Sequence, residues 1–217
     1  MTINNNSKEI VFIFSLPRSG STLLQRILMT SSDITSANEP WILLWLTSIF
    51  RKDLSESKYN HSSLINAIHD NNTNYAKDKL FLKNNIKDFA NRYYQNLTED
   101  SNAKYFVDKT PNYILIINEI FELFQDSKFI FLSRNPLAVA ASISKAWTKN
   151  KIQFSQYHYL FNEGVESFSE NYTKNKDRVL LIKYENLVKN PNDQIKKINQ
   201  YLNLQNKINT NNLNTSN

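Results

Sequence analysis

The feature that most constrains this chain is a short polar loop between an apolar run and an amphipathic segment. Residues 10–14 (Ile-Val-Phe-Ile-Phe) predict a buried strand, and residues 23–29 predict a helix. Residues 15–22, Ser-Leu-Pro-Arg-Ser-Gly-Ser-Thr, join the two. A strand, a tight loop and a helix in this order direct free backbone N–H groups and the positive end of the helix dipole at one anion. The sequence therefore predicts an anion site at this loop.

Glycine usage singles out the same loop. The chain contains only two glycines, Gly20 and Gly164, whereas average usage would give about 15 in a chain of this length. A chain that nearly avoids glycine has placed one of them here. This indicates a turn, or a close contact that a Cβ atom would block.

Composition narrows the class of protein. A length of 217 residues, with 41% hydrophobic and 12% aromatic residues, is enough for a sizeable core. The net charge of +6 suits an anionic ligand, but no dense basic run predicts nucleic-acid binding. The absence of cysteine excludes disulfides and Cys-ligated metals. The polar N-terminus and the lack of an apolar run of about 20 residues predict a cytoplasmic protein without a membrane span.

Short apolar segments alternate with helical ones along the rest of the chain. Further strands are predicted at 104–108, 128–132 and 178–184, and helices at 41–50, 111–124, 137–147, 153–171 and 191–202. This order predicts an α/β fold of three layers, with a mostly parallel central sheet flanked by helices.

The remaining segments are predicted from weaker signals. Residues 31–40 are polar and loop-like, with Pro40 expected at the first position of the next helix. Residues 53–100 are predicted to be a helical insert, and the inner face of its amphipathic helix is expected to carry Ile86, Phe89, Ala90, Tyr93 and Leu97. We expect a single domain over residues 1–204 and a disordered, Asn-rich tail over 205–217.

The predicted sheet also indicates where a ligand binds. In sheets of this kind ligands bind outside the carboxyl ends of the strands. The loops expected at that edge are residues 15–22, 108–111, 133–136 and 183–186.

The first of these loops differs from the nucleotide-binding pattern G-x-x-x-x-G-K-[ST]. Ser15 replaces the first glycine, and Ser21 replaces the lysine that reaches the β- and γ-phosphates. Without that lysine, the loop does not suit Mg²⁺-triphosphate chemistry. Arg18 instead places a guanidinium fork inside the loop, and this fork suits a phosphate or a sulfate. We therefore expect a smaller anionic group, held without a metal.

Three motifs together resemble one enzyme family. Residues 17–24 resemble the 5′-phosphosulfate loop of sulfotransferases that use 3′-phosphoadenosine 5′-phosphosulfate (PAPS). Residues 131–136, with Ser142, resemble the 3′-phosphate-binding segment of that family, and residues 183–187 resemble its Tyr-Glu-x-Leu strand end. The resemblance implies a P-loop NTPase-like sulfotransferase fold with PAPS as the donor. The donor-binding residues that it implies are Pro17, Arg18, Ser19, Gly20, Ser21, Thr22, Arg134, Ser142 and Tyr184.

The residues of the second motif agree with this interpretation. Arg134 leaves a predicted strand end, and Ser142 follows eight residues later, which is about two helical turns. An arginine and a hydroxyl group suit a dianionic phosphate. The alternative is that Arg134 only caps the sheet edge through a salt bridge.

The resemblance also implies two catalytic residues. Sulfuryl transfer needs stabilised charge on the leaving oxygen and a base for the proton of the acceptor. Lys109 resembles the lysine that stabilises the bridging oxygen in tyrosylprotein-type sulfotransferases. Glu39, 21 residues after Arg18, matches the spacing of their glutamate base. The alternatives are a solvated turn lysine and a glutamate that only favours a helix N-terminus.

The chain departs from the family pattern in three places. No histidine lies at a predicted strand end, so His61, His69 and His158 are expected to be surface or packing residues. Only Lys145 occupies the zone of the basic residue that often follows the helix serine. The third departure is that the sequence lacks the basic, Gly-containing C-terminal loop that usually closes over the nucleotide. Residues 148–175 or a partner subunit could then form the lid. Alternatively, the chain is a weakly active relative.

The sequence thus predicts a PAPS-dependent sulfotransferase that acts on a hydroxyl or an amine. The acceptor is expected to be a small molecule, a carbohydrate or a peptide. The sequence is also compatible with a homodimer. Two alternatives remain. One is a P-loop nucleotide kinase, which is disfavoured because Ser21 replaces the phosphate-binding lysine, and the other is a nucleotide-binding relative that has kept the fold without catalysis.

Overall fold

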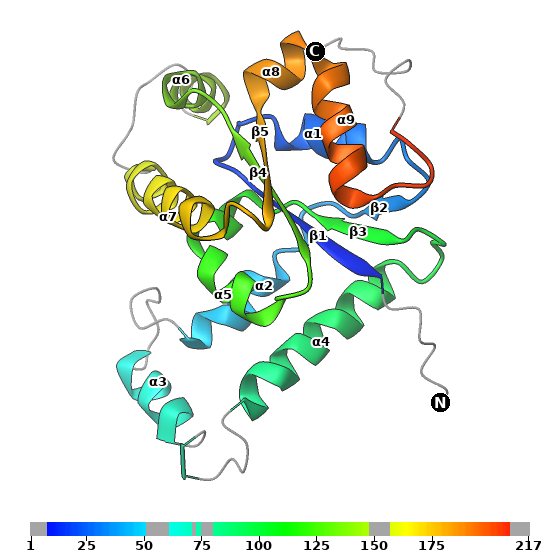
Figure 1. Ribbon diagram of the computed structural model, residues 1–217. Helices are drawn as coiled ribbons and strands as arrows, with labels where there is room; N and C mark the ends of the chain where they lie inside the picture. Colours follow the sequence, from blue (N-terminus) through cyan, green and yellow to red (C-terminus); the bar gives the residue numbers. More distant parts are fainter. Residues whose placement is uncertain (1–7, 51–60, 71–72, 75–79, 148–156, 209–217) are drawn as a thin grey trace.

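The computed structural model describes residues 8–50, 61–70, 73–74, 80–147 and 157–208. Within these ranges, five strands form one sheet in the order β2-β3-β1-β4-β5, with β1 at the centre (Figure 1). All four pairings are parallel, so the prediction of a parallel central sheet is confirmed. The strands are β1 (Glu9–Phe14), β2 (Ile34–Ser36), β3 (Tyr105–Asp108), β4 (Lys128–Ser133) and β5 (Val179–Lys183).

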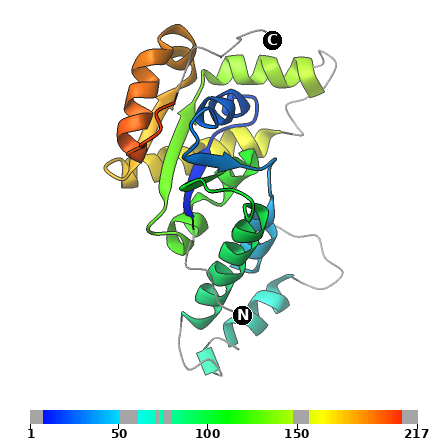
Figure 2. The same cartoon turned by 90° about the vertical axis from the view of Figure 1, so that its right-hand side faces the viewer.

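Helices cover both faces of the sheet, which gives the predicted three layers (Figures 1 and 2). One face is covered by α1 (Ser21–Leu28), α8 (Tyr184–Lys189) and α9 (Pro191–Leu202). The other face is covered by α2 (Ile42–Thr47), α4 (Phe81–Leu97), α5 (Ile117–Leu123), α6 (Pro136–Trp147) and α7 (Val165–Asn175). The short helices η1 (Ser48–Phe50), η3 (Pro111–Leu115) and η5 (Leu160–Gly164) join these elements, and α3 (His61–Asp70) lies beyond α2.

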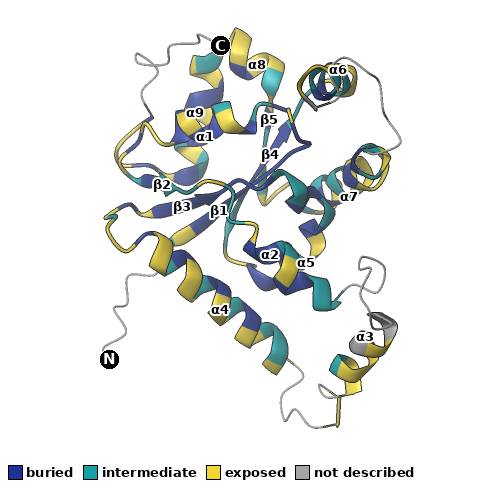
Figure 3. Ribbon diagram, turned by 180° about the vertical axis from the view of Figure 1, so that it is seen from behind, coloured by how far each residue is buried: buried dark blue, intermediate teal, exposed yellow. Residues whose placement is uncertain are grey.

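The central strand shows why the apolar runs are continuous. Successive side chains of a strand point to opposite faces, and both faces of this sheet are covered. Val11 and Ile13 therefore pack towards α1 and α9, whereas Phe12 and Phe14 pack towards α5 and α7. All four side chains are fully buried. Figure 3 shows the general pattern, with much of the sheet coloured as buried and the outer sides of the helices coloured as exposed.

The loop prediction for residues 31–40 is wrong at two points. Residues 34–36 form β2, which pairs with β3 as an edge strand. Three residues are too few to show a strand period in the sequence. Pro40 does not begin a helix either, because α2 begins at Ile42 and Trp41 is its N-cap, with a φ of 58°.

The inner face of α4 is rotated from the predicted one. Its buried residues are Ile86, Ala90 and Tyr94. The exposed fractions of Phe89, Tyr93 and Leu97, which were expected inside, are 49%, 38% and 40%. Both sets have helical spacing, so periodicity alone does not choose between them. Tyr94 lies inside because its hydroxyl donates a hydrogen bond to Asp108 at the end of β3.

Three other predicted boundaries also shift. The predicted helix 111–124 is broken at Ile116 between η3 and α5. Tyr184 begins α8 instead of ending a strand. The predicted helix 153–171 corresponds to η5 and α7 from residue 160 onwards, and its residues 153–156 lie outside the described ranges.

The prediction of a disordered tail is wrong for residues 205–208. The carboxylate of Asp33 accepts hydrogen bonds from the backbone N–H groups of Gln205, at 2.7 Å, and Asn206, at 2.9 Å. Ile208 is buried against α9 and is only 6% exposed. Residues 209–217 lie outside the described ranges.

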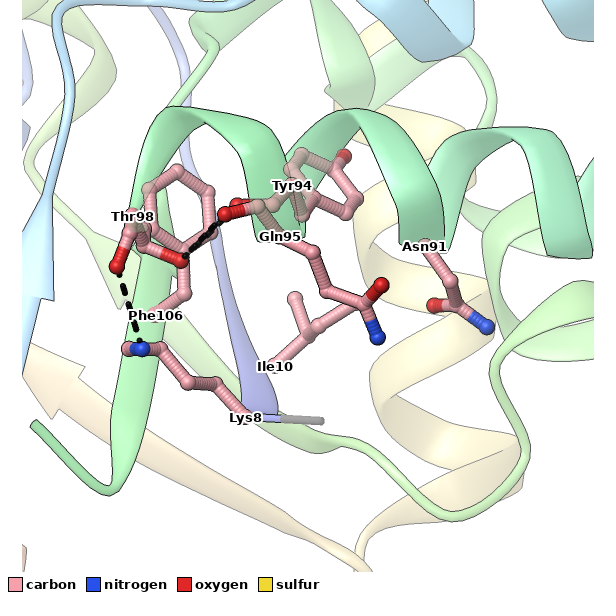
Figure 4. Close-up of a pocket in the computed structure, with 7 residues that line it drawn as sticks. All are labelled: Lys8, Ile10, Asn91, Tyr94, Gln95, Thr98 and Phe106. Atoms are coloured by element: carbon pink, nitrogen blue, oxygen red, sulfur yellow. Dashed lines mark hydrogen bonds between the residues drawn. The ribbon is translucent and has the colours of Figure 1, made fainter. Parts of the chain in front are cut away.

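The C-terminal end of α4, in the helical insert, is hydrogen-bonded to the residue before β1. Lys8 Nζ donates a hydrogen bond of 3.2 Å to the carbonyl oxygen of Thr98, just after α4 (Figure 4). The small pocket drawn there lies between α4 and the first residues of β1 and β3. It lies at the amino ends of these strands, opposite to the edge where the loops predicted to bind a ligand emerge.

Candidate active site

The candidate site residues gather at the carboxyl edge of the sheet. Parallel strands all end at the same edge, and the loops after β1, β3, β4 and β5 begin there. The predicted positions of these four loops are confirmed. The segment after the edge strand β2 leads to Glu39 and arrives at the same edge.

The loop after β1 is a tight turn that leads directly into α1. Arg18 and Gly20 both have left-handed backbone angles, with φ of 63° and 91°. The N–H of Ser19 donates 3.2 Å to the carbonyl oxygen of Leu16, which closes the turn. Among the described residues no side chain caps the N-terminus of α1, and the first N–H groups of a helix have no partner within it. Ser21 and Thr22, in the first turn, therefore keep N–H groups for a ligand, whereas that of Ser19 is already used.

Gly20 is required by a close contact with another strand end. A Cβ atom at this position would lie 2.3 Å from Cδ2 of Tyr184. The prediction that the glycine permits a close contact is therefore consistent with the structure. The Arg134 guanidinium lies over the same tyrosine ring, with 4.3 Å between Cζ and the ring centroid. Tyr184 thus joins the loop after β1 to the loop after β4.

Two arginines and a serine meet at this loop. Arg134 Nη1 donates to the carbonyl oxygen of Arg18 at 2.8 Å, and Arg18 Nε donates to Ser142 Oγ at 3.3 Å. Among the described residues neither arginine has an ion-pair partner. The alternative of a salt bridge at Arg134 is therefore wrong for that part of the chain. Two guanidinium groups without a carboxylate suit an anionic ligand.

The second group of predicted residues is an ion pair. Lys109 Nζ lies 2.6 Å from Glu39 Oε1. The Lys109 side chain is 6% exposed and that of Glu39 is 31% exposed. The alternative of a solvated turn lysine is therefore wrong. Glu39 turns its carboxylate to Lys109 and lies two residues before the N-cap of α2.

Two residues that the sequence analysis missed, Gln25 and Ser36, connect α1 with the segments that lead to this ion pair. Gln25, on α1, donates from Nε2 to Ser36 Oγ at 2.6 Å and to the carbonyl oxygen of Ala37 at 2.9 Å. Ser36 Oγ in turn donates to the carbonyl oxygen of Val107 in β3. A polar residue at a buried position of an apolar helix was the signal that could have identified Gln25.

A buried carboxyl group lies next to Lys109. Asp108 ends β3 and has no exposed surface. It accepts hydrogen bonds from Tyr94 Oη at 2.6 Å and from Thr110 Oγ1 at 3.0 Å. Burial raises the pKa of Asp108 to about 6, although these hydrogen bonds, the Tyr113 hydroxyl and the charge of Lys109 act against the rise. The sequence analysis also missed this residue.

The remaining predicted residues are the three histidines, Lys145 and the lid segment. His69 and His158 are exposed, as expected, and the side chain of His61 is outside the described part. Lys145 is exposed on α6, one turn after Ser142. Of the predicted lid, residues 148–156 are outside the described ranges.

Comparison with known proteins identifies the family. The model of the sulfotransferase family matches residues 10–207. The chain belongs to the sulfotransferase family. It is 30% identical over 140 residues to the nodulation protein NoeE of Sinorhizobium fredii, which covers 64% of this chain and 32% of that protein. It is 26% identical over 206 residues to a protein-tyrosine sulfotransferase of Drosophila melanogaster, which covers 91% of this chain and 38% of that protein. The chain thus spans only about a third of each of these relatives.

Solved structures agree with this assignment. The sulfotransferase domain from the curacin biosynthetic pathway is 25% identical, with a TM-score of 0.62 over 91% of this chain and 74% of that one. The sulfotransferase domain of the Synechococcus PCC 7002 olefin synthase is 23% identical and shares the fold, with a TM-score of 0.61 over 94% and 76%. A mouse sulfotransferase complexed with PAP is 16% identical, with a TM-score of 0.50 over 92% and 59%. The predicted family resemblance and fold are therefore confirmed. In the described ranges, no helix has both the length and the apolar character needed to cross a membrane.

Proposed function

We propose that this chain is a PAPS-dependent sulfotransferase that uses Glu39 as its base. The observation that carries the proposal is the 2.6 Å pair between Lys109 and Glu39. This pair lies at the strand edge that also holds residues 15–22, here called the anion loop. A buried lysine beside a carboxylate can neutralise charge on one oxygen while the carboxylate accepts a proton from another.

The donor set of the chain fits the two anionic ends of PAPS. The uncapped N-terminus of α1 and Arg18 would hold the 5′ end, together with the rest of the loop from Pro17 to Thr22. Arg134 and Ser142 would hold the 3′-phosphate, and Tyr184 would support Arg134. Bound PAPS would supply the sulfuryl group. The mouse neighbour of the same fold was solved with PAP, which supports a nucleotide of this class.

The two catalytic residues would divide the work at the acceptor. Glu39 would accept the proton of the acceptor hydroxyl or amine, since it is partly exposed and lies at the open edge. Lys109 would stabilise charge on the oxygen that leaves, since its ammonium group is fixed and largely shielded from water. No metal is needed in this scheme, because arginines and lysine supply the positive charge.

The acceptor class is inferred from the relatives of the chain. Protein-tyrosine sulfotransferases are among the relatives, and this favours a peptide acceptor, with a carbohydrate or small molecule as the alternatives. We also propose a cytoplasmic location, a single domain that extends to residue 208, and a homodimer as the arrangement to be tested first.

Calorimetric titration with 3′-phosphoadenosine 5′-phosphate (PAP) tests the donor site. Wild type should bind PAP, and Arg18→Ala and Arg134→Ala should each weaken binding by about 10-fold or more, since each removes a charge-assisted contact. Arg178→Ala is the matched control, because Arg178 precedes β5 at the opposite edge. If wild type does not bind PAP, the donor assignment is wrong.

Transfer from radiolabelled PAPS tests the base. The probes are a tyrosine-containing peptide, 2-naphthol and octyl glucoside. Glu39→Gln should keep PAP affinity and lose transfer. Transfer near the wild-type rate in Glu39→Gln would place the base elsewhere. PAP binding without transfer to any probe would favour a non-catalytic relative, and Mg²⁺-dependent ATPase activity would favour a nucleotide kinase.

A further inference from the structure

Lys109, the candidate catalytic lysine, lies between two residues whose side chains are hydrogen-bonded to each other. Thr110 Oγ1 donates 3.0 Å to Asp108 Oδ1, so the side chains on either side of Lys109 close a small ring. Both residues are fully buried. This ring holds the backbone of residues 108–110 at the point where Lys109 leaves β3.

The same carboxylate is anchored from outside the loop. Tyr94 Oη, on α4, donates 2.6 Å to Asp108 Oδ2. Asp108 is also held from the sheet side, since it pairs in register with Phe12 of the central strand. Both carboxylate oxygens therefore accept a hydrogen bond. One donor, Tyr94, belongs to the helical insert, and the other, Thr110, directly follows Lys109.

The glutamate side of the pair is fastened to the same region. Tyr113, four residues after Lys109, accepts a hydrogen bond of 3.1 Å at Oη from the backbone N–H of Leu43 in α2. α2 is the helix that follows Glu39. The segments that carry Lys109 and Glu39 are thus fixed to each other by a contact other than their ion pair.

We propose that Asp108 is a positioning residue, held by Tyr94 and Thr110, that keeps Lys109 in line with Glu39 and so sets the rate of sulfuryl transfer. This rests on the proposed function. It also gives the insert helix α4 a role: through Tyr94, it supports the lysine of the site. A displacement of reacting groups by about 1 Å can lower a rate by about 100-fold.

Two conservative variants test this without removing the buried carboxylate. Tyr94→Phe and Thr110→Val each remove one donor to Asp108 and keep nearly the same volume. Each should lower kcat by about 10-fold or more and leave the PAP dissociation constant within about twofold, since neither residue touches the anion loop. Thr110→Ser should restore most of the rate lost in Thr110→Val. Tyr93→Phe is the matched control, because Tyr93 is the exposed neighbour of Tyr94 on α4.

A second measurement reports on Lys109 without any acceptor. In ¹⁵N-lysine-labelled protein, Lys109 should give a protected ammonium signal, which Lys109→Arg assigns by its loss. The signal should disappear in Tyr94→Phe and Thr110→Val and persist in Thr110→Ser and Tyr93→Phe. If wild type transfers no sulfuryl group, the proposed function fails while this signal still decides the positioning role.

Two results would overturn the proposal. Unchanged kcat and an unchanged Lys109 signal in both Tyr94→Phe and Thr110→Val would show that Asp108 does not position the lysine. Equal losses of kcat and PAP affinity, with a lowered melting temperature, would show that the buried cluster only stabilises the fold.

Discussion

Replacing Gly20 with alanine is the sharpest test of how the anion loop is built. Alanine at this position meets two separate obstacles. Its backbone must adopt a φ of 91°, and its Cβ atom would lie 2.3 Å and 2.4 Å from two ring carbons of Tyr184. Both distances are far shorter than a normal carbon–carbon contact of about 3.5 Å, so the ring must move.

The two effects have separate magnitudes. A left-handed backbone costs an L-residue about 1–2 kcal/mol. Displacing Tyr184 from beneath Arg134 removes a cation–π contact of about 0.5–1 kcal/mol at a partly exposed site. We expect Gly20→Ala to lower the free energy of unfolding by on the order of 2 kcal/mol, which corresponds to about 4–8 °C in melting temperature for a chain of this size. The PAP dissociation constant should rise by about 10-fold or more, because Arg134 loses its support.

The other glycine provides the matched control. Gly164 ends η5, and a Cβ atom there would lie 3.2 Å from Ile114 Cγ2, a tight contact with the end of a side chain. Gly164→Ala should change stability by less than about 1 kcal/mol and leave PAP affinity unchanged.

Urea unfolding and PAP calorimetry, combined in a double-mutant cycle with Tyr184→Ala, complete this test. The contact predicts a coupling free energy of about 1 kcal/mol or more between positions 20 and 184. Stability within about 0.5 kcal/mol of wild type, or strictly additive effects, would refute the reasoning.

Three further predictions address other parts of the chain. Because burial raises the pKa of Asp108 from 3.8 to about 6, the folded state binds this proton more tightly, and wild-type stability should fall as the pH rises from about 4 to 6. Asp108→Asn should lack this fall. The difference in unfolding free energy between wild type and Asp108→Asn should therefore change by on the order of 3 kcal/mol over that pH range. A difference that stays constant with pH would contradict the raised pKa of Asp108. Arg134→Lys keeps the charge but loses the planar fork, and calorimetry should show a PAP dissociation constant raised about 10-fold, whereas wild-type affinity would remove the reason for an arginine. Asp33→Ala should cost about 1 kcal/mol in urea unfolding, because it removes the hydrogen bonds that hold the exposed residues 205–206 against the fold, while unchanged stability would show that this contact is not needed.

Most of the fold could be predicted from local patterns. Apolar runs such as residues 10–14 and 128–132 mark strands buried on both faces, and their alternation with helices predicts a parallel sheet. From a parallel sheet it follows that Arg18, Lys109 and Arg134 emerge at one edge. The scarcity of glycine then directs attention to Gly20.

The errors arise where long-range contacts decide between local alternatives. The face of α4 is chosen by the hydrogen bond between Tyr94 and Asp108, whose residues lie in different elements. β2 is a strand only because it pairs with β3, and its three residues carry no period of their own. Likewise, the ring that makes Gly20 necessary belongs to Tyr184, and no pattern near the loop indicates it.

The contacts of the anion loop also bear on synthesis of the chain. Arg18 meets Arg134 across a separation of 116 residues and Ser142 across 124, and Gly20 contacts Tyr184 later still. A chain emerging from the ribosome therefore holds the loop early but cannot complete it until β5 and the start of α8 have followed. Contacts of such long range form slowly. Nascent intermediates should thus lack donor affinity, and PAP should bind only chains that extend beyond Tyr184.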